Sequence, residues 1–378
     1  MEINLVGSTN SISSLEEIVY FSQKPARRCY SGKDWKELLE EPKNERLIQQ
    51  SLKSGHHSVF EHMNLTFNIN GIPKILAMIL NNEKQYATSE KSARYTQMKD
   101  IEPGQKEKYD DWMGLLTAEI DKVFPKIKKD RDKAIKKLAQ ENARYMTSVF
   151  TSTEMVHTVN LRQLNFIVYE FEDFIQKYEK SDETIKHKLI PSMKDFLSET
   201  EWLKIKGLKN QTDRELSFFN PDQVEEHFGD VYSTSYLLSF AGLAQTQRHR
   251  TIDYSICKGT ELGAPLGFLI PAIIRENTKL SKKWANDLEK IAEYDFPQAQ
   301  LLKINEMGIK RNFRSKMRLR LCGHAQYEIM ENTLAVANKY AKYNKDIEKM
   351  LSTGKPQCTP NGCKGCNWGN RYGIKRDV

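Results

Sequence analysis

Two stretches of this chain carry the same order of secondary-structure signals, and this repetition limits the folds that the chain can adopt. In the first, residues 64–70 alternate polar and apolar side chains, a period-two pattern that predicts a half-buried strand. Gly71 ends the pattern, and Pro73 before the apolar run ILAMIL predicts the start of a helix. In the second, the strand signal VYSTSYLLSF at 231–240 takes the place of residues 64–70. The segment that follows it, up to Arg250, takes the place of ILAMILNNEK.

Short motifs recur along with these signals. Glu61-His62 returns as Glu226-His227, and Glu154-Met155-x4-Asn160-Leu161-Arg162 returns as Glu306-Met307-x4-Asn312-Phe313-Arg314. The offsets lie at about 150 to 165 residues throughout, which indicates an internal duplication. Chance matches between short motifs are the alternative interpretation.

Helical composition dominates the rest of the chain. We expect helices within 14–50 and 105–145, a helix entered through a turn at 152–178, and one long helix from about Asn312 to Met350. The spacing of Ile329, Thr333, Val336 and Tyr340 predicts a buried stripe on that last helix. The predicted class is α+β, with a first repeat over 1–200, a second over 201–352 and a Cys-rich tail over 353–378.

Charge and hydropathy narrow the class of protein. The net charge of +8 is a mild excess, and the lysines of 122–137 alternate with apolar residues as on a solvated helix face. Nucleic-acid binding is therefore not expected, whereas a small anionic substrate would account for the excess equally well. The N-terminus has no secretory signal pattern, and the apolar run at 267–274 is too short to cross a membrane. We expect a cytoplasmic protein.

The stretch Gln245-Thr-Gln-Arg248-His249-Arg250 is the strongest candidate for a binding site. Arg248 and Arg250 offer planar forks that suit phosphate or carboxylate groups. His249 can donate, accept or carry charge near neutral pH. A solvated basic turn is the alternative, and the choice between the two depends on residues elsewhere in the chain.

Those residues resemble a known family. Gly55-His56-x-Ser58-x-x-Glu61-His62, followed later by Glu90-x-Ser92-x-Arg94-Tyr95, resembles the flavin-dependent thymidylate synthases (ThyX). The hallmark of that family is Arg-His-Arg, seven residues and Ser, extended through Glu-x-Ser-x-Arg-Tyr. The first half has Asn82-Glu83-Lys84 in place of Arg-His-Arg but keeps the second part of the motif. The second half keeps Arg248-His249-Arg250 but has Lys258 in place of the Ser.

The same division appears downstream. The first half keeps Asn160-x-Arg162, which resembles the flavin motif of the family, but has Phe171 where a helix arginine is expected. The second half keeps that arginine as Arg320, shortly before His324-Ala-Gln-Tyr-Glu-Ile. Arg144 resembles a nucleotide-binding arginine of the family. Each half thus retains motifs that the other has lost.

The resemblance implies a fold, a reaction and a set of site residues. It implies two tandem ThyX-like repeats and transfer of a one-carbon unit from methylenetetrahydrofolate to C5 of dUMP, with FAD as cofactor and NADPH as reductant. The family forms homotetramers with sites between subunits, so a fused pair implies a homodimer that acts as a pseudo-tetramer with composite sites. Arg320 is the implied catalytic residue. The implied substrate contacts are Glu90, Ser92, Arg94, Arg144, Gln245, Arg248 and Arg320. The implied FAD contacts are Ser58, Glu90, Asn160, Arg162, Arg248, His249 and Arg250.

The C-terminal cysteines depart from this family. Cys358-x4-Cys363-x2-Cys366 in a Gly-rich tail is a spacing typical of zinc or iron–sulfur ligation, with Cys29, Cys257, Cys322 or a histidine as the fourth ligand. Unligated thiols or a redox pair are the alternative. His56, His57 and His62 lack His-Glu-x-x-His spacing and are not expected to bind zinc. Two other functions stay open: a pyrimidine deoxynucleotide C5 hydroxymethylase, and a non-catalytic flavin or nucleotide sensor with a cysteine redox switch.

Overall fold

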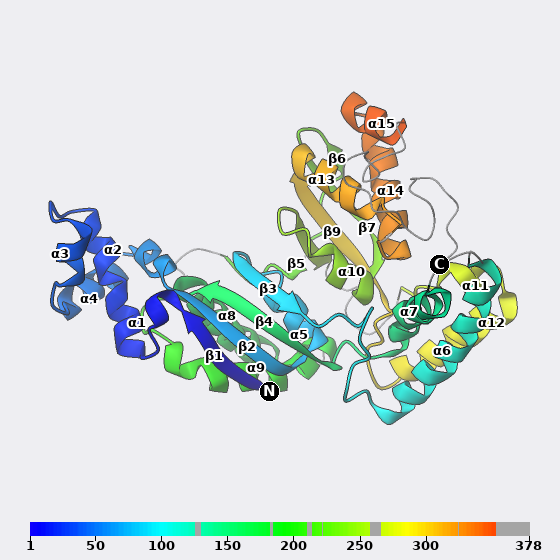
Figure 1. Cartoon of the computed structure of the whole chain (residues 1–378), viewed down its shortest axis with the longest axis horizontal. Coiled ribbons are helices and arrows are strands. Elements are labelled where there is room, and N and C mark those ends of the chain that lie inside the picture. Colours follow the sequence, from blue (N-terminus) through cyan, green and yellow to red (C-terminus); the bar gives the residue numbers. More distant parts are fainter. Residues whose placement is uncertain are drawn as a thin grey trace. The chain divides into compact units, whose positions relative to one another are not determined.

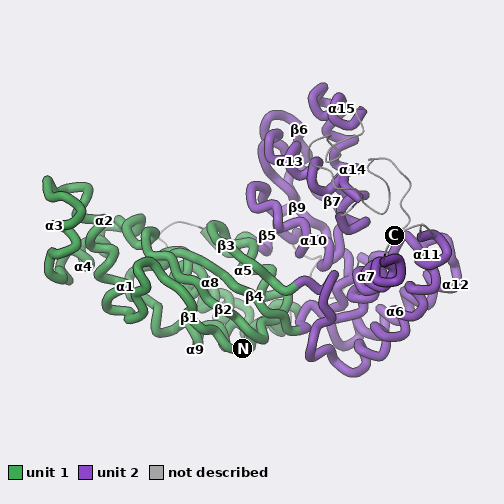
Figure 2. The backbone as a smooth tube through the Cα atoms, in the orientation of Figure 1, with its two compact units in different colours: residues 1–91, 152–217 green, residues 92–151, 218–378 purple. Residues whose placement is uncertain are grey.

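The computed structural model describes residues 1–124, 130–181, 184–209, 214–220, 222–257, 266–323 and 325–352. The chain divides into two compact units (Figure 2). Unit 1 comprises Met1–Lys91 and Ser152–Ser217, and unit 2 comprises Ser92–Thr151 and Phe218–Val378. These units do not follow the repeat boundaries expected at residues 200 and 352, because the middle of the first half belongs to unit 2.

Unit 1 contains a four-stranded antiparallel sheet in the order β1-β2-β4-β3 (Figure 1). Its strands are β1 (Glu2–Ser8), β2 (Asn64–Pro73), β3 (Tyr86–Glu90) and β4 (Ser152–Asn160). Helices α5 (Lys74–Leu80), α8 (Leu161–Tyr178) and α9 (Thr184–Thr200) pack against this sheet. The other helices of unit 1 are α1 (Leu15–Phe21), α2 (Gln23–Arg28), α3 (Trp35–Leu39), α4 (Glu45–Lys53) and the 3-10 turns η1 (Thr9–Ser11), η2 (His57–His62) and η4 (Glu201–Leu203).

Unit 2 contains a five-stranded sheet in the order β5-β8-β9-β7-β6, antiparallel except for the β5–β8 pair. Its strands are β5 (Phe219–Asn220), β6 (His227–Phe228), β7 (Val231–Ser239), β8 (Asp253–Cys257) and β9 (Leu301–Ile309). Its helices are α6 (Pro103–Val123), α7 (Arg131–Ala143), α10 (Phe240–Thr246), α11 (Ala272–Arg275), α12 (Thr278–Ala292), α13 (Lys310–Arg320), α14 (Tyr327–Ala341), α15 (Lys345–Ser352) and the 3-10 turn η3 (Arg144–Met146).

The two sheets share one chain path. In unit 1, β2 leads into α5 and then β3, and β4 leads into α8, with β4 paired between β2 and β3. In the second sheet, β7 leads into α10 and then β8, and β9 leads into α13, with β9 paired between β7 and β8. A pair of helices follows the strand after the short helix in both cases, α6–α7 after β3 and α11–α12 after β8. All four of these helices lie in unit 2 (Figure 2).

The packing of those four helices forms one hydrophobic core. Trp112 of α6 and Trp284 of α12 are fully buried and meet edge to face, with ring centroids 4.7 Å apart. The indole N–H of Trp112 donates to Asp287 over 3.0 Å, so its one polar atom is satisfied. Ser148 bridges to Pro297 in an isolated antiparallel pair just before β4 and β9 begin. Helices from the two halves of the sequence therefore share one core inside unit 2.

Several sequence-based predictions are confirmed, and others are wrong. The strands at 64–70 and 231–240 and the helix after Pro73 are confirmed. Residues 152–178 are not one helix, because 152–160 form β4, in which Thr153, Met155, His157 and Val159 are buried with period two. The strand β3 is not among the elements predicted from the sequence. Sequence reasoning therefore missed a strand whose burial alternates weakly.

The predicted single helix from Asn312 to Met350 is also wrong, because it consists of α13, α14 and α15. The first break follows Arg320, at Leu321 and Cys322, and the second lies before Asn344, whose side chain accepts from the backbone N–H of Ile347 as a helix cap. The predicted stripe on α14 is confirmed, since Ile329, Thr333, Val336 and Tyr340 are all buried.

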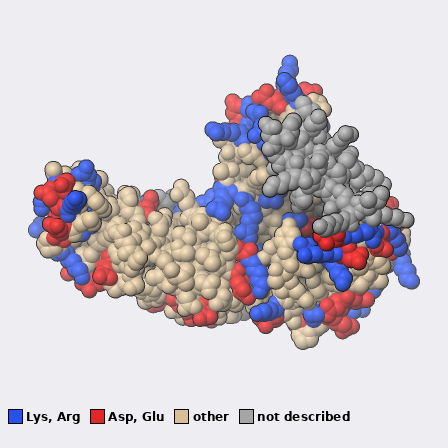
Figure 3. Space-filling model, viewed as in Figure 1, with Lys and Arg blue, Asp and Glu red and all other residues tan. Residues whose placement is uncertain are grey.

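Charged side chains of both signs intermingle over α1–α4 on the face shown in Figure 3. Such mixing is typical of a solvated surface and gives this region no single-sign patch on the visible face. Among the described residues, no helix combines the length and the apolar character needed to cross a bilayer.

Candidate functional site

The Arg248-His249-Arg250 turn follows α10 and precedes β8 in unit 2. Its backbone is fixed by hydrogen bonds from the N–H of His249 to the carbonyl of Thr246, over 3.0 Å, and from the N–H of Ile252 to the carbonyl of His249. Ser239 caps α10 by accepting from the N–H of Gly242. These bonds hold the side chain of His249 buried, while Arg250 is exposed.

His249 and Arg320 contact each other directly. The Nε of Arg320 donates to Nε2 of His249 over 2.7 Å, and its Nη2 donates to the carbonyl oxygen of Gln245 over 3.1 Å. Arg320 is the last residue of α13, so the end of this helix lies against the turn. Two acceptors from one turn thus fix the orientation of the Arg320 guanidinium.

The electrostatics of this contact keep His249 neutral. Burial first, and then the positive charges of Arg320 and Lys316, together lower the pKa of His249 to about 3. Burial also lowers the pKa of Arg320; Tyr254 opposes that shift, whereas Arg94 and Arg248 add to it. A neutral imidazole can accept the Arg320 hydrogen bond across the physiological pH range.

Arg94 and Arg144 from the first half of the sequence lie in the same unit as this turn. The Nε of Arg94 donates to Glu141 over 2.5 Å. Arg144 is buried, and its Nη2 donates to Gln326 over 2.5 Å, while its Nε has no hydrogen-bond partner among the described residues. Burial lowers the pKa of Arg144; Tyr145 and Glu141 oppose that shift, and the charge of Arg94 adds to it. Unit 2 therefore brings together Arg94, Arg144, Gln245, Arg248, His249 and Arg320 from both halves of the sequence.

A buried carboxylate supports this arrangement from behind. Glu328 accepts from the hydroxyl of Tyr145 over 2.7 Å, and from the N–H and hydroxyl of Ser239 over 2.7 and 2.8 Å. Gln326 also donates to Glu328. A side chain added at Gly242 would approach Glu328 to 2.8 Å, so the absence of a Cβ at this glycine leaves the room for the carboxylate. Gln326 and Glu328 thereby link η3, which carries Arg144, to the start of α10.

A second buried network was missed by sequence reasoning. Lys316 and Glu306 form an ion pair over 2.5 Å, with side chains only 1% and 0% exposed. Tyr232 donates to Glu306 over 2.7 Å, and Tyr236 donates to its other oxygen. Lys316 lies one helical turn before Arg320 on α13. The recurrence of Tyr in VYSTSY offered a signal, but its partner Glu306 was read only as part of a motif.

The expected FAD contacts divide between the units. Ser58, Glu90, Asn160 and Arg162 lie in unit 1, whereas Arg248, His249 and Arg250 lie in unit 2. Asn160 caps α8 by accepting from the N–H of Gln163 over 2.8 Å, and Arg162 pairs with Glu61 over 2.6 Å. Glu90 accepts from Lys74 and from Asn81, and its side chain is almost fully buried. Ser92 lies in unit 2, and its carbonyl accepts from the N–H of Tyr95.

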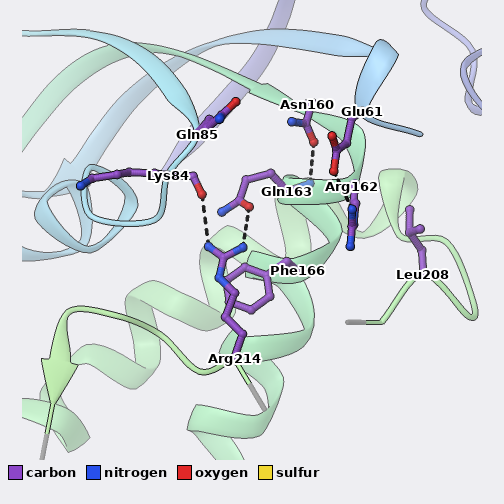
Figure 4. Close-up of a pocket in the computed structure, with 9 residues that line it drawn as sticks. All are labelled: Glu61, Lys84, Gln85, Asn160, Arg162, Gln163, Phe166, Leu208 and Arg214. Atoms are coloured by element: carbon purple, nitrogen blue, oxygen red, sulfur yellow. Dashed lines mark hydrogen bonds and ion pairs between the residues drawn. The ribbon is translucent and has the colours of Figure 1, made fainter. Parts of the chain in front are cut away.

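Asn160 and Arg162 line a pocket of 310 Å³ within unit 1 (Figure 4). Its lining residues come from the start of α8, the α5–β3 turn, η2 and the segment after α9: Glu61, Lys84, Gln85, Asn160, Arg162, Gln163, Phe166, Leu208 and Arg214. Arg214 is not among the site residues predicted from the sequence. Its role here could not have been found from the sequence, because it depends on a contact with Glu83, 131 residues earlier.

The predicted metal site lies outside the described residues, since Cys358, Cys363 and Cys366 fall within 353–378. Of the candidate fourth ligands, Cys29 is exposed, Cys257 is buried beside Asn305, and Cys322 is half-buried. In the part of the chain that the structure describes, no group of three or more His, Cys, Asp or Glu side chains is arranged to hold a metal ion. Lys258 and His324 also fall outside the described residues.

Comparison with known proteins now bears on this geometry. Residues 14–170 match the family model described as "Thymidylate synthase complementing protein". A flavin-dependent thymidylate synthase from Pseudothermotoga lettingae is 30% identical over 156 residues, which span 39% of this chain and 69% of that relative. The chain belongs to the flavin-dependent thymidylate synthase family.

Solved structures give weaker likenesses to this family member. The ThyX of Helicobacter pylori with FAD and dUMP is 17% identical to this chain, with a TM-score of 0.32. The match covers 56% of this chain and 100% of the H. pylori chain. The UMP/dUMP methylase PolB of Streptomyces cacaoi, bound with 5-Br dUMP, is 18% identical with a TM-score of 0.29, over 44% and 76% of the two chains. These structural similarities are too low to add to the assignment, and membership of the family rests on the sequence comparisons.

Proposed function

We propose that this protein is a flavin-dependent enzyme that transfers a one-carbon unit from methylenetetrahydrofolate to C5 of dUMP, as in thymidylate synthesis. Family membership supports the reaction class, and the arginine cluster of unit 2 supports an anionic nucleotide as substrate. We assign substrate contacts to Ser92, Arg94, Arg144, Gln245, Arg248 and Arg320.

The observation that carries this proposal is the excess of positive charge around Arg320. Arg94 and Arg248 both depress the pKa of Arg320, so these guanidinium groups lie within electrostatic reach of one another. Arg144 is buried with an unpartnered Nε, which leaves a desolvated cation incompletely compensated. A phosphate dianion offers charge-assisted, bidentate acceptors to such groups. The cluster therefore suits the phosphate of dUMP.

Arg320 is the proposed catalytic residue. Uracil C5 is a weak nucleophile, and a cation against the ring carbonyl and N3 favours the enolate-like form in which C5 attacks. His249 and the Gln245 carbonyl hold two edges of the guanidinium, so its remaining Nη1 can face a substrate without reorientation.

FAD fits the residues that unit 1 offers for it. The pocket beside Asn160 and Arg162 joins the N-terminus of the 18-residue helix α8 to cationic side chains, which suits a pyrophosphate. Arg162 and Asn160 would hold it there, together with Ser58, which is exposed and stands three residues before the lining residue Glu61. When bound, FAD supplies the electrons that reduce the transferred methylene group to a methyl group, with NADPH as their source. Glu90 would have to exchange its bonds to Lys74 and Asn81 in order to contact FAD.

We also infer that the chain arose by tandem duplication. The common path of the two sheets supports this, as does the edge-to-face packing of Trp112 and Trp284 from corresponding helix pairs. The segment that carries Ser92, Arg94 and Arg144 lies with the second sheet, which supports a nucleotide site composed of both halves. Sedimentation equilibrium of the purified chain tests the expected homodimer, and a stable monomer would exclude it.

Two alternatives keep the same fold. A C5 hydroxymethylase would use the same nucleotide contacts, and the replacement of a family Ser by Lys258 motivates it. A non-catalytic flavin or nucleotide sensor would use Cys358, Cys363 and Cys366 as a redox switch or as ligands of a zinc ion or an iron–sulfur cluster.

Turnover assays distinguish these functions. The purified chain is incubated with dUMP, methylenetetrahydrofolate and NADPH, and the product mass is measured. A gain of one methyl group supports the proposal, a hydroxymethyl group supports the first alternative, and no product with bound flavin supports the second. Visible spectra before and after dithionite report the flavin and any iron–sulfur cluster together, and a colourless protein that releases no flavin contradicts every function that depends on flavin.

A further inference from the structure

The α5–β3 turn of unit 1 has the same relation to its helix as the Arg248-His249-Arg250 turn has in unit 2. Glu83 is the third residue after α5, and His249 is the third residue after α10. Both side chains are buried, and each holds an arginine: Glu83 holds Arg214, and His249 holds Arg320. The two arginines come from different places, since Arg320 ends the helix after β9 whereas Arg214 lies in the segment after α9.

The first half has lost its own helix arginine at this corner. Phe171 is the eleventh residue of α8, as Arg320 is the eleventh of α13. Phe171 is fully buried and packs edge to face on Phe196 of α9, with ring centroids 5.3 Å apart. It therefore offers no polar group to a pocket, and any guanidinium at this corner must come from another segment.

Arg214 supplies that guanidinium. Its Nη1 donates to Oε1 of Gln163 over 3.0 Å, and its Nη2 donates to the carbonyl of Lys84 over 3.2 Å and to Glu83 over 3.3 Å. The guanidinium stacks on Phe166, with its central carbon 3.8 Å from the ring centroid. Figure 4 shows Arg214 below Lys84 and Gln163, with its guanidinium directed up toward both of them and beside the Phe166 ring.

Glu83 does not depend on Arg214 for its hydrogen bonds. Its Oε1 accepts from the N–H and hydroxyl of Ser217 over 2.6 and 2.9 Å, both shorter than the contact to Arg214. The Arg214 side chain is 39% exposed, whereas Glu83 is fully buried. The Arg214 guanidinium thus stays partly accessible from the pocket, while its contacts with Gln163, Lys84 and Glu83 fix its orientation.

The pocket around Arg214 is built for an anion. Lys84, Arg162 and Arg214 bring three cations to the lining, where Glu61 pairs with Arg162 and the buried Glu83 behind the lining pairs with Arg214. The N-terminus of α8 adds its partial positive charge to the same space. We propose that Arg214 is a phosphate-binding residue of this pocket, which replaces the lost helix arginine of the first half and takes a phosphate-bearing nucleotide. The proposal rests on the proposed function in that FAD is the expected ligand.

A purely structural role for Arg214 makes a different prediction. If Arg214 only neutralises Glu83, its loss destabilises the fold, and removing the Glu83 charge as well restores both stability and binding. If Arg214 contacts phosphate, the double variant restores stability but not binding. The full chain is therefore compared as wild type, Arg214→Met, Glu83→Gln and Glu83→Gln/Arg214→Met.

The free energy of unfolding is measured by denaturant titration, and Kd is measured by calorimetry with FAD and, separately, with dUMP. We expect both variants that lack Arg214 to bind one of these probes about tenfold more weakly or worse, as loss of a charge-assisted hydrogen bond requires. A change confined to FAD identifies a dinucleotide pocket, and a change confined to dUMP identifies a mononucleotide pocket. Arg27→Met is the matched control, because Arg27 is an ion-paired arginine of unit 1 with a similar exposure of 36%.

Wild-type Kd values for both probes in the Glu83→Gln/Arg214→Met variant would overturn the proposal and leave Arg214 a structural residue. Failure of the proposed function looks different, because the wild-type chain itself would then bind neither FAD nor dUMP.

Discussion

The corners that follow α5 in unit 1 and α10 in unit 2 have the same backbone plan and different chemistry. After α10, a neutral histidine accepts from Arg320, which comes from the end of α13 in the same unit. After α5, a buried glutamate accepts from Arg214, which comes from the segment of the sequence after α9. One backbone plan therefore carries an arginine at its corner in two ways, and in both the third residue after the helix accepts a hydrogen bond from that arginine.

The strands behind the two corners differ as well. The sixth residue of the strand is His157 in β4 and Glu306 in β9. The seventh residue of the helix that follows is Ile167 in α8 and Lys316 in α13. His157 stacks on Tyr86, with ring centroids 5.4 Å apart, whereas Glu306 and Lys316 form a buried ion pair. The second sheet thus places a cation directly behind His249 and Arg320, and the first sheet has no charge on the helix at that position.

The largest effect is expected from breaking that ion pair. Lys316→Met leaves Glu306 charged and buried, so we expect a loss of about 3–5 kcal/mol in the free energy of unfolding. Denaturant titration measures it, and Glu306→Gln in the same chain should recover part of the loss. Lys310→Met, which removes an exposed pair on the same helix, should change stability by no more than about 1 kcal/mol. A similar loss in both single variants would contradict the importance of burial.

Next in size is the loss of the proposed catalytic cation. Arg320→Ala should lower kcat by roughly 10²–10³-fold, since it removes a donor aimed at the charge that develops in the transition state. Single-turnover rates with saturating dUMP measure this effect. Arg318→Ala, on the exposed side of the same helix, should retain wild-type kcat. Equal rates for the two variants would remove Arg320 from the mechanism.

Substitution of Arg144 tests whether the arginine cluster of unit 2 binds an anion. Arg144→Met removes a buried, incompletely bonded cation, so stability without ligand should change by no more than about 1 kcal/mol or rise. The increase in melting temperature on adding dUMP should become smaller than in the wild type, because the variant binds the ligand less tightly. A strong loss of stability without ligand would show that Arg144 serves the fold alone.

A separate effect concerns pH. The pKa of His249 is about 3 in the folded chain and near 6.5 when unfolded, so between these values the unfolded chain binds the extra proton. The contribution of His249 to stability is therefore present above pH 6.5 and is lost as pH falls toward 3, by up to about 1.4 kcal/mol per pH unit. His249→Gln should flatten this slope, as measured by denaturant titrations at several pH values. An unchanged slope would contradict a buried neutral imidazole.

The sequence predicted the strands and helices whose periodicity is strong. Residues 64–70 and the stripe on α14 are examples, since burial on one face of an element leaves a pattern in its own residues. β4 was misread because STEMVHTVN runs without a break into the helix-forming α8. The correspondence between Glu154 and Glu306 was also misplaced, since the strand bounds align Glu306 with His157.

The site could be predicted only where motifs carry it. Arg248–Arg250 and Arg320 stand out by residue type and spacing, and the contact between Arg320 and His249 agrees with their selection. Arg214 and Lys316 could not be found this way, because each acts through partners that are distant in sequence or through burial. Their positions follow from the paths of the two sheets and from no local pattern.

The central claim is that one nucleotide site combines residues from the two halves of the chain inside unit 2. Calorimetric titration of dUMP into wild type and Arg94→Ala tests it directly, with Arg131→Ala as a control on α7, where the arginine pairs with Asp121 at the surface. We expect Arg94→Ala to bind dUMP at least about tenfold more weakly, as loss of a charge-assisted phosphate contact requires. Wild-type affinity in Arg94→Ala would contradict the composite site.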